Sequence, residues 1–197
     1  MTKSQMNVAI LISGRGSNML ALAKAIADPD YPAQVVGVIS DQTDAKGLTL
    51  AAELNIPTIA IARSNFSSKA EHEAAIQKQL EMWKAEIVCL AGYMRIFSAD
   101  FIENWPARFI NIHPSLLPKF KGLDTHQRVL NAGDPEHGTT VHYVTAGMDE
   151  GPVIAQARVT VEADDTVETL TNRVLVEEHK LYPMALRKLI DAFLAKQ

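Results

Sequence analysis

Short apolar runs alternate with Ala- and Leu-rich amphipathic segments through the first half of the chain. The runs are apolar throughout, as strands of a parallel sheet covered on both faces are. The predicted strands are Val8–Ile12, Gln34–Ile39, Pro57–Ala62, Glu86–Leu90 and Arg108–Ile112. The predicted helices between them are Ser17–Ala27, Lys46–Leu54 and a segment from the capping-box pattern SKAE at Ser68 to about Lys84. This alternation predicts an α/β fold with a Rossmann-like, doubly wound, mainly parallel sheet.

The second half of the chain has a different pattern. Thr139–Thr145 and Val153–Val161 are strand-like and are separated by the turn-rich segment AGMDEGP, with no helix between them. They predict a hairpin or another antiparallel C-terminal addition to the sheet. A helix is expected over Asp165–Leu181 with Glu168 as a capping partner, and Pro183 is expected to start a further helical segment to about Leu194. Without a repeat or a linker, residues 1–197 are expected to form a single domain.

Composition narrows the functional classes. The chain has 197 residues, of which 47% are hydrophobic, and a formal net charge of −4. Broad nucleic-acid binding is not expected, because no basic face is evident. The apolar run near the N-terminus is too short to span a bilayer and no secretory cleavage site follows it, so a cytoplasmic location is expected. The single cysteine, Cys89, is expected to be a buried apolar residue.

The motif SGRGSN at residues 13–18 follows the first predicted strand and opens the first predicted helix. Its glycines let a ligand approach the backbone closely. A helix N-terminus offers free N–H groups and a partial positive charge, so phosphate is a natural ligand. Ser17 and Asn18 add side-chain donors. Met19 stands at the third glycine position of G-x-G-x-x-G, which disfavours a nicotinamide cofactor. A tight turn without a ligand is the alternative.

A second candidate is the segment NIHPS, which ends the fifth predicted strand. Asn111 and His113 are two residues apart, so they project from the same face of a strand. Carboxyl ends of strands are where open α/β sheets bind ligands. Pro114 favours an extended His113 and cannot continue the ladder. An amide beside an imidazole suits stabilisation of an oxyanion; a structural histidine is the alternative.

The acidic residues of the AGMDEGP turn are a third candidate for the functional site. Asp149 and Glu150 lie between two predicted strands, where they form either a solvated turn or a carboxylate that approaches His113 and favours its charged form.

The other histidines are less informative. His126, His137 and His142 fall in one region, but none shows helical metal-ligand spacing, so no metal site is expected. His72 and His179 fall on predicted helices and are expected at the surface or near helix ends.

Taken together, the motifs SGRGSN, AGYMRI, INIHPSLLPKFKG, HGTTVHYVTAGMDEGPVI and EEHKLYP resemble the glycinamide ribonucleotide formyltransferase family, in order and over nearly the whole chain. The resemblance implies the formyltransferase fold. It implies transfer of a formyl group from 10-formyltetrahydrofolate to the amine of 5-phosphoribosylglycinamide, a step of de novo purine biosynthesis. It also implies a phosphate-binding half over about residues 1–105 and a catalytic and folate-binding half over about 106–197.

Residue roles carried over from the family form three sets. The catalytic set implied by the resemblance is Asn111, His113 and Asp149. The substrate set is Gly16, Ser17, Asn18 and Glu178. The set that contacts the folate is Lys69, Met94, Arg95, Ile96, Phe97, Asn111, Thr145, Ala146, Gly147, Met148 and Asp149. No metal is implied, and the resemblance leaves a homodimer open.

The implied mechanism is direct attack of the substrate amine on the formyl carbon. Asn111 and protonated His113 would donate hydrogen bonds to the developing oxyanion. Asp149 would keep His113 charged and, through water, help to move a proton from the amine to the leaving folate nitrogen.

Two positions depart from the family pattern, and a third is variable. Lys69 stands where an arginine is common and keeps the charge without the bidentate fork. Leu175 stands where some members have a glutamine near the substrate phosphate. Arg15 is at a variable position, where it either adds charge near the phosphate or faces solvent.

Three alternative functions share parts of this pattern. A formyltetrahydrofolate hydrolase would use a similar set of residues but usually has an N-terminal regulatory domain, for which Met1–Asn7 leaves no room. A methionyl-tRNA formyltransferase would need a C-terminal RNA-binding domain, and the chain ends at Gln197. A folate- or nucleotide-binding regulator is disfavoured by the intact set of Asn111, His113 and Asp149.

Overall fold

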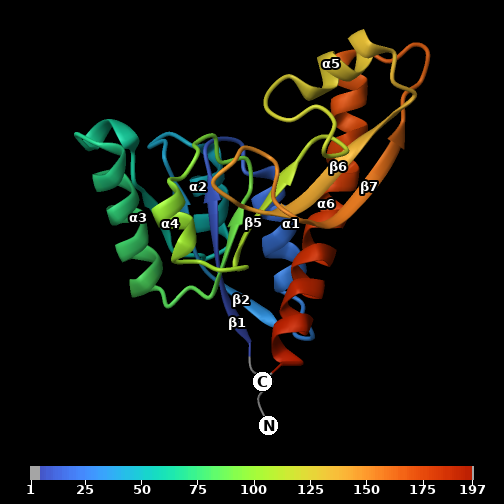
Figure 1. Cartoon of the computed structure of the whole chain (residues 1–197). Coiled ribbons are helices and arrows are strands. Elements are labelled where there is room, and N and C mark those ends of the chain that lie inside the picture. The colour runs from blue at the N-terminus through green and yellow to red at the C-terminus, as the bar shows by residue number, and fades with distance from the viewer. Residues whose placement is uncertain (1–4, 197) are drawn as a thin grey trace.

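A computed structural model of the chain describes residues 5–196, which form one seven-stranded sheet in the order β3-β2-β1-β4-β5-β6-β7 (Figure 1). The first five strands pair in parallel, and β6 pairs antiparallel with both β5 and β7. The strands are β1 Met6–Ile12, β2 Ala33–Ser40, β3 Thr58–Ala60, β4 Ile87–Leu90, β5 Phe109–His113, β6 Glu136–Tyr143 and β7 Val153–Thr160. The predicted fold class, with its antiparallel C-terminal addition, is confirmed.

Helices cover both faces of the parallel part of the sheet. One hydrophobic cluster joins the sheet to α1, α2 and α6, and a second joins its other face to α3 and α4. A smaller cluster packs α5 and β7 against the first half of α6, in the arm at the upper right of Figure 1. The helices are α1 Ser17–Ile26, α2 Lys46–Glu53, the short 3₁₀ turn η1 Arg63–Asn65, α3 Lys69–Met82, α4 Ala99–Glu103, α5 Thr125–Ala132 and α6 Val167–Leu194. None of the helices within residues 5–196 is long and apolar enough to cross a membrane.

The C-terminal helix corrects the prediction of two helical segments. α6 runs unbroken from Val167 through Pro183 to Leu194; Thr166 is its N-cap, and the capping partner is Thr169 rather than the expected Glu168. The Thr166 and Thr169 hydroxyls cap each other's backbone N–H groups. A proline inside a helix costs about 3 kcal/mol. Tertiary contacts offset this cost, because Pro183 is buried and its carbonyl accepts a hydrogen bond from the Tyr31 hydroxyl at 2.6 Å.

Other differences are local. α4 and α5 were not predicted, β3 is shorter than expected, and β6 begins three residues earlier at Glu136. His72 was expected at the surface or near a helix end; it lies in the first turn of α3, but its ring is buried and its Nε2 lies 2.8 Å from the carbonyl of Ile61. The cap of α3 is confirmed, because Ser68 Oγ accepts the backbone N–H of Glu71. Cys89 is buried as expected, and burial raises the pKa of its thiol to about 12.

One buried hydroxyl joins α6 to the centre of the sheet. Tyr182 is fully buried, and its hydroxyl lies 2.9 Å from the carbonyl of Leu90 and 3.2 Å from that of Ile110. Leu90 ends β4, and Ile110 immediately precedes Asn111 on β5. The contact therefore ties the two strands together where they approach the candidate site.

We expect Tyr182→Phe to lower the free energy of unfolding by about 1–3 kcal/mol, because it leaves buried carbonyls without their donor. Urea denaturation measures the change. Tyr143→Phe is the matched control, since the Tyr143 hydroxyl makes no hydrogen bond with any residue between 5 and 196, and a change within about 0.5 kcal/mol is expected there. Equal losses in both variants would show that the Tyr182 hydroxyl contributes nothing specific.

Candidate active site

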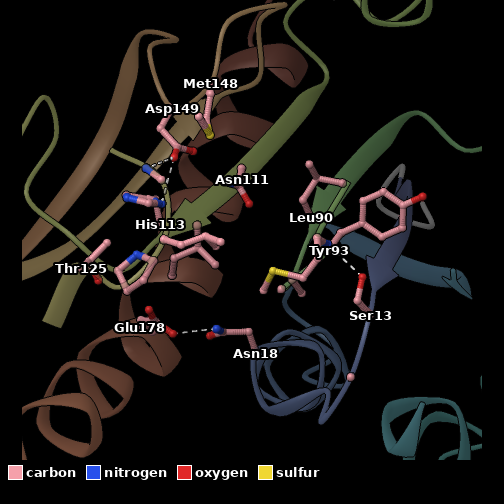
Figure 2. A pocket seen from close by; sticks show the side chains of 18 of the residues that line it. Ser13, Asn18, Leu90, Tyr93, Asn111, His113, Thr125, Met148, Asp149 and Glu178 are labelled. Atoms are coloured by element: carbon pink, nitrogen blue, oxygen red, sulfur yellow. Dashed lines mark hydrogen bonds and ion pairs between the residues drawn. The ribbon is translucent and has the colours of Figure 1, made fainter. Parts of the chain in front are cut away.

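A cavity of about 700 Å³ opens at the carboxyl ends of the parallel strands. This is the edge at which open α/β sheets bind their ligands. Its walls come from the loop after β1, the loop after β4, the end of β5, the start of α5, the β6–β7 turn and one side of α6 (Figure 2). Segments far apart in sequence thus converge on one space, and every catalytic and substrate-binding residue expected from the sequence lines it.

The glycine-rich loop leaves the N-terminus of α1 open. Gly16 is the N-cap in a left-handed conformation (φ 75°), no side chain caps the helix, and its first turn has no acidic residue. A Cβ on Gly16 would lie 2.6 Å from the Cα of Gly47, so glycine is required for the two backbones to approach this closely. The N–H groups of the first turn remain available for an anion.

A buried carboxylate stands opposite this loop. Glu178 of α6 is 6% exposed, and its Oε2 accepts a hydrogen bond from Asn18 Nδ2 at 2.7 Å (Figure 2). Burial raises the pKa of Glu178, an effect that the Asn18 hydrogen bond and the charge of Arg15 partly offset. Asn18 Oδ1 is buried and has no hydrogen-bond partner among the described residues. The oxygen atoms of Asn18 and Glu178 can therefore accept further hydrogen bonds, which suits hydroxyl groups of a ligand.

Asn111 and His113 both reach the cavity from β5, as their spacing predicted. The strand ends at His113, before Pro114, also as predicted. The His113 ring is nearly buried between two acceptors. Its Nε2 lies 3.0 Å from the carbonyl of Phe120, and its Nδ1 lies 3.3 Å from Asp149 Oδ2. A ring that faces an acceptor at each nitrogen satisfies both only as imidazolium.

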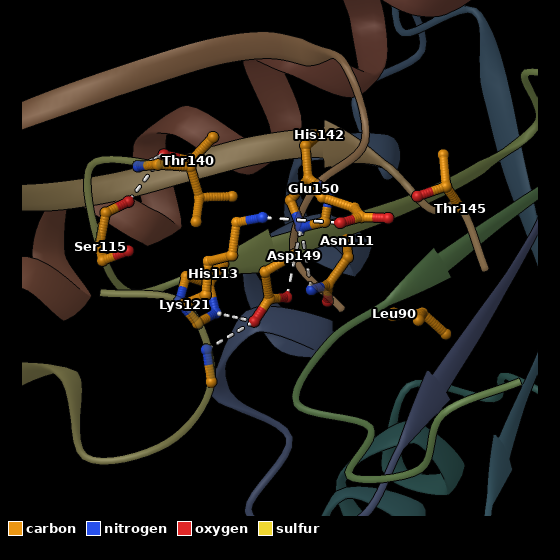
Figure 3. Close-up of polar contacts among 12 residues, drawn as sticks. Leu90, Asn111, His113, Ser115, Lys121, Thr140, His142, Thr145, Asp149 and Glu150 are labelled. Carbon is orange, nitrogen blue, oxygen red and sulfur yellow. Dashed lines mark hydrogen bonds and ion pairs between the residues drawn. The ribbon is translucent and has the colours of Figure 1, made fainter. Parts of the chain in front are cut away.

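Asp149 joins the β6–β7 turn to the end of β5 and to the segment after it (Figure 3). Its Oδ2 accepts the backbone N–H of Gly122 at 2.9 Å in addition to facing His113. The neighbouring Glu150 points to Lys121, with the charged atoms 3.7 Å apart, and both side chains are exposed. Of the two acids in the turn, Asp149 is therefore the one that approaches His113, as expected.

His142 is a member of the cluster that the sequence did not assign to the site. It is 2% exposed and lies opposite Asn111 on β6. Its Nδ1 lies 2.8 Å from the Tyr143 carbonyl, so this nitrogen carries the proton and Nε2 accepts from Asn111 Nδ2 at 3.3 Å. Burial lowers the pKa of His142 and so favours this neutral form. Its place on a strand that pairs with β5 was the available signal, because that pairing sets it beside Asn111.

The residues expected to contact the folate fall into three positions. Met94, Arg95, Ile96 and Phe97 line the side of the cavity after β4, where Met94 and Ile96 are exposed. Thr145, Gly147, Met148 and Asp149 line it from the β6–β7 turn, whereas Ala146 of the same turn does not. Lys69 lines a smaller adjoining cavity of about 420 Å³, which shares residues 93–97 with the first.

The remaining histidines divide into separate groups. His126 Nδ1 and His137 Nε2 lie 2.9 Å apart, whereas His142 contacts Asn111 instead. Within residues 5–196, no group of three or more His, Cys, Asp or Glu side chains is placed to hold a metal ion.

The cavity is lined on one side by the uncapped N-terminus of α1 and on the other by the amide of Asn111, the imidazole of His113 and the carboxylate of Asp149. This arrangement is typical of an enzyme that acts on a carbonyl centre of a phosphorylated substrate. Residues 6–186 match the formyl transferase family, and the chain belongs to that family.

The relatives define the branch more closely. The chain is 42% identical over 186 residues, 94% of its length, to the phosphoribosylglycinamide formyltransferase of Escherichia coli (strain K12), of which it covers 88%. It is similar to the crystal structure of phosphoribosylglycinamide formyltransferase from Brucella melitensis, with a TM-score of 0.90 and 52% identity over 93% of this chain and 95% of that one. It is also 46% identical over 91% of its length to the Bos taurus trifunctional purine biosynthetic protein adenosine-3, of which it spans only 18%.

The buried His137, paired with the half-buried His126, gives a prediction for the pH dependence of stability. Burial and then the neighbouring His126 lower the pKa of His137 from 6.5 to about 4. Between these values the unfolded chain binds a proton that the folded chain does not, so stability falls as the pH falls. We expect His137→Gln to flatten the pH dependence of the unfolding free energy between pH 6.5 and 4, as measured by urea denaturation.

Measurements of the same variant near pH 8 serve as the control. Near pH 8 both proteins have this site uncharged, so any difference there reports lost packing rather than protonation. An unchanged slope in the acidic range would contradict the assignment to His137.

Proposed function

We propose that this formyltransferase moves the formyl group of 10-formyltetrahydrofolate to the amine of 5-phosphoribosylglycinamide, giving formylglycinamide ribonucleotide and tetrahydrofolate in de novo purine biosynthesis. The observation that carries the proposal is the convergence of Asn111, His113 and Asp149 in one cavity, with the open N-terminus of α1 on its other side. The names of the relatives support the same acceptor, phosphoribosylglycinamide, and transfer of a formyl group.

The cavity suggests how the two substrates lie. The phosphate of the ribonucleotide binds the first turn of α1 at Gly16, Ser17 and Asn18, and the ribose hydroxyls meet Glu178. The folate lies between Met94–Phe97 and Thr145–Asp149, against largely exposed apolar side chains. The amine and the formyl group then meet beside Asn111 and His113.

The chemistry requires one bond to form and one to break. The amine nitrogen bonds to the formyl carbon, and the formyl oxygen becomes an oxyanion that accepts hydrogen bonds from Asn111 and from His113 as imidazolium. Asn111 has a second amide hydrogen free for this purpose while His142 holds the first. His113 Nε2 faces the Phe120 carbonyl in this structure, so the ring exchanges that acceptor for the oxyanion.

Collapse of the intermediate breaks the bond between the carbon and the folate nitrogen. The proton lost by the amine passes to that nitrogen through water, assisted by Asp149, which also holds the charged ring at Nδ1. The step needs no covalent enzyme intermediate and no metal.

The wider assignments belong to the same proposal. A phosphate-binding half over about residues 1–105 and a catalytic and folate-binding half over about 106–197 form one domain. The partners are the two small molecules rather than nucleic acid or a membrane, the location is the cytoplasm, and a homodimer stays open to a measurement of mass in solution.

We expect His113→Gln and Asp149→Asn to lower turnover by roughly 10²–10³, the usual cost of removing an oxyanion donor or its support, while ribonucleotide binding persists. Absorbance of the deformylated folate measures turnover. Glu150→Gln is the matched control in the same turn, because Glu150 points to Lys121 rather than into the His113 cluster, and turnover within about twofold is expected. Near-normal turnover in both site variants would contradict the mechanism.

The same assay tests the acceptor. Product should form only when 5-phosphoribosylglycinamide is present. Equal rates without it would indicate a formyltetrahydrofolate hydrolase, and no product in either case would indicate a binding protein.

A further inference from the structure

The cavity contains few fixed positive charges. Among the residues that line it, only Arg15 and Arg95 carry one at every physiological pH. A phosphate monoester carries about −1.5 to −2 charges at pH 7, whereas the end of a helix supplies about half of one positive charge. A site for such a group therefore needs a cation as well as backbone N–H groups.

Arg95 is already committed to a partner. Its guanidinium forms an ion pair with Asp41, a carboxylate that is only 3% exposed. Separating the two would leave Asp41 buried and unpaired, which is strongly unfavourable. Arg95 also lies on the loop after β4, on the side of the cavity shared with the smaller one.

Arg15 is in the opposite situation. It is exposed, lies directly before the N-cap of α1, and makes no hydrogen bond or ion pair with any residue in the described range 5–196. Its charge nevertheless reaches Glu178 across the cavity, because it is among the causes that act on the pKa of that carboxyl. Arg15 therefore lines the cavity and has no partner among the described residues.

The facing wall does not supply a cation either. α6 contributes Val167, Thr171 and Leu175 at intervals of four residues, so one side of the helix lines the cavity with two apolar groups and a hydroxyl. The next residue of α6 that lines the cavity, Glu178, is acidic.

A second observation indicates a ligand at this helix end. Asn18 lines the cavity and is 9% exposed, and its Oδ1 has no hydrogen-bond donor among the described residues. An unsatisfied buried acceptor costs about 1–3 kcal/mol. A sugar phosphate that binds here brings hydroxyl groups to the Asn18–Glu178 corner and its phosphate to the N–H groups of α1.

We propose that Arg15 binds the phosphate group of the ribonucleotide and is the residue that makes the site select phosphorylated over unphosphorylated substrates. The inference rests on the proposed function for the identity of the substrate, but the phosphate contact itself does not. A guanidinium donates two parallel hydrogen bonds to phosphate oxygens, a geometry that an ammonium group does not reproduce. Arg15 takes no part in the formyl transfer at His113.

The first test is kinetic. We expect Arg15→Gln to raise KM for 5-phosphoribosylglycinamide at least tenfold, with kcat within about twofold and KM for the folate unchanged, because the contact is made equally in the ground and transition states. Arg15→Lys should recover part of the loss. Arg158→Gln is the matched control: it makes the same charge change at an exposed ion pair with Glu136, away from the cavity, and should leave all three constants unchanged.

The second test does not depend on activity. Calorimetric titration with ribose 5-phosphate and with inorganic phosphate should show binding to the wild-type protein and at least tenfold weaker binding to Arg15→Gln, but not to Arg158→Gln. A wild-type protein that binds these ligands through Arg15 yet fails to formylate the ribonucleotide would overturn the proposed function and leave this inference standing. Unchanged binding and unchanged KM in Arg15→Gln would overturn the inference and leave the proposed function standing.

Discussion

The position of β5 between a parallel and an antiparallel neighbour is the constraint on which the site depends. β5 pairs with β4 so that Asn111 lies beside Leu90, and with β6 so that Asn111 lies opposite His142. Both ladders must hold at once, which fixes where the strand ends and which way its last side chains point. The amide and the imidazole are therefore placed by backbone hydrogen bonds of the core rather than by mobile loops, as a preorganised site requires.

Other polar groups of the cavity lie on connections between strands and helices. Asp149 belongs to the β6–β7 turn and is joined to the segment after β5 by its hydrogen bond to Gly122. In the proposed mechanism, β5 supplies the oxyanion donors, and the β6–β7 turn supplies the carboxylate that supports His113. At the other end of the cavity, no side chain caps the first turn of α1, and the exposed Arg15 lies directly before it.

Much of this could be predicted from local patterns. The continuous apolar runs identified all five parallel strands, and the two antiparallel strands were recognised from the absence of a helix between them. The same-face spacing of Asn111 and His113 and the glycine-rich loop before a helix each follow from the geometry of a single element, so the sequence sufficed for them. The unbroken α6 was not predictable, because local propensity disfavours Pro183 and only packing against Tyr31 and the core overrides it.

What the sequence by itself determined is the set of elements and the residue types that each of them presents, since period and spacing are properties of neighbouring residues. The tertiary structure decided which of these residues meet. It paired His142 with Asn111, selected Asp149 over Glu150, set His126 against His137 and left Arg15 uncommitted while Arg95 is neutralised by Asp41. These choices depend on strand register, burial and charge between segments distant along the chain, and no local pattern contains them.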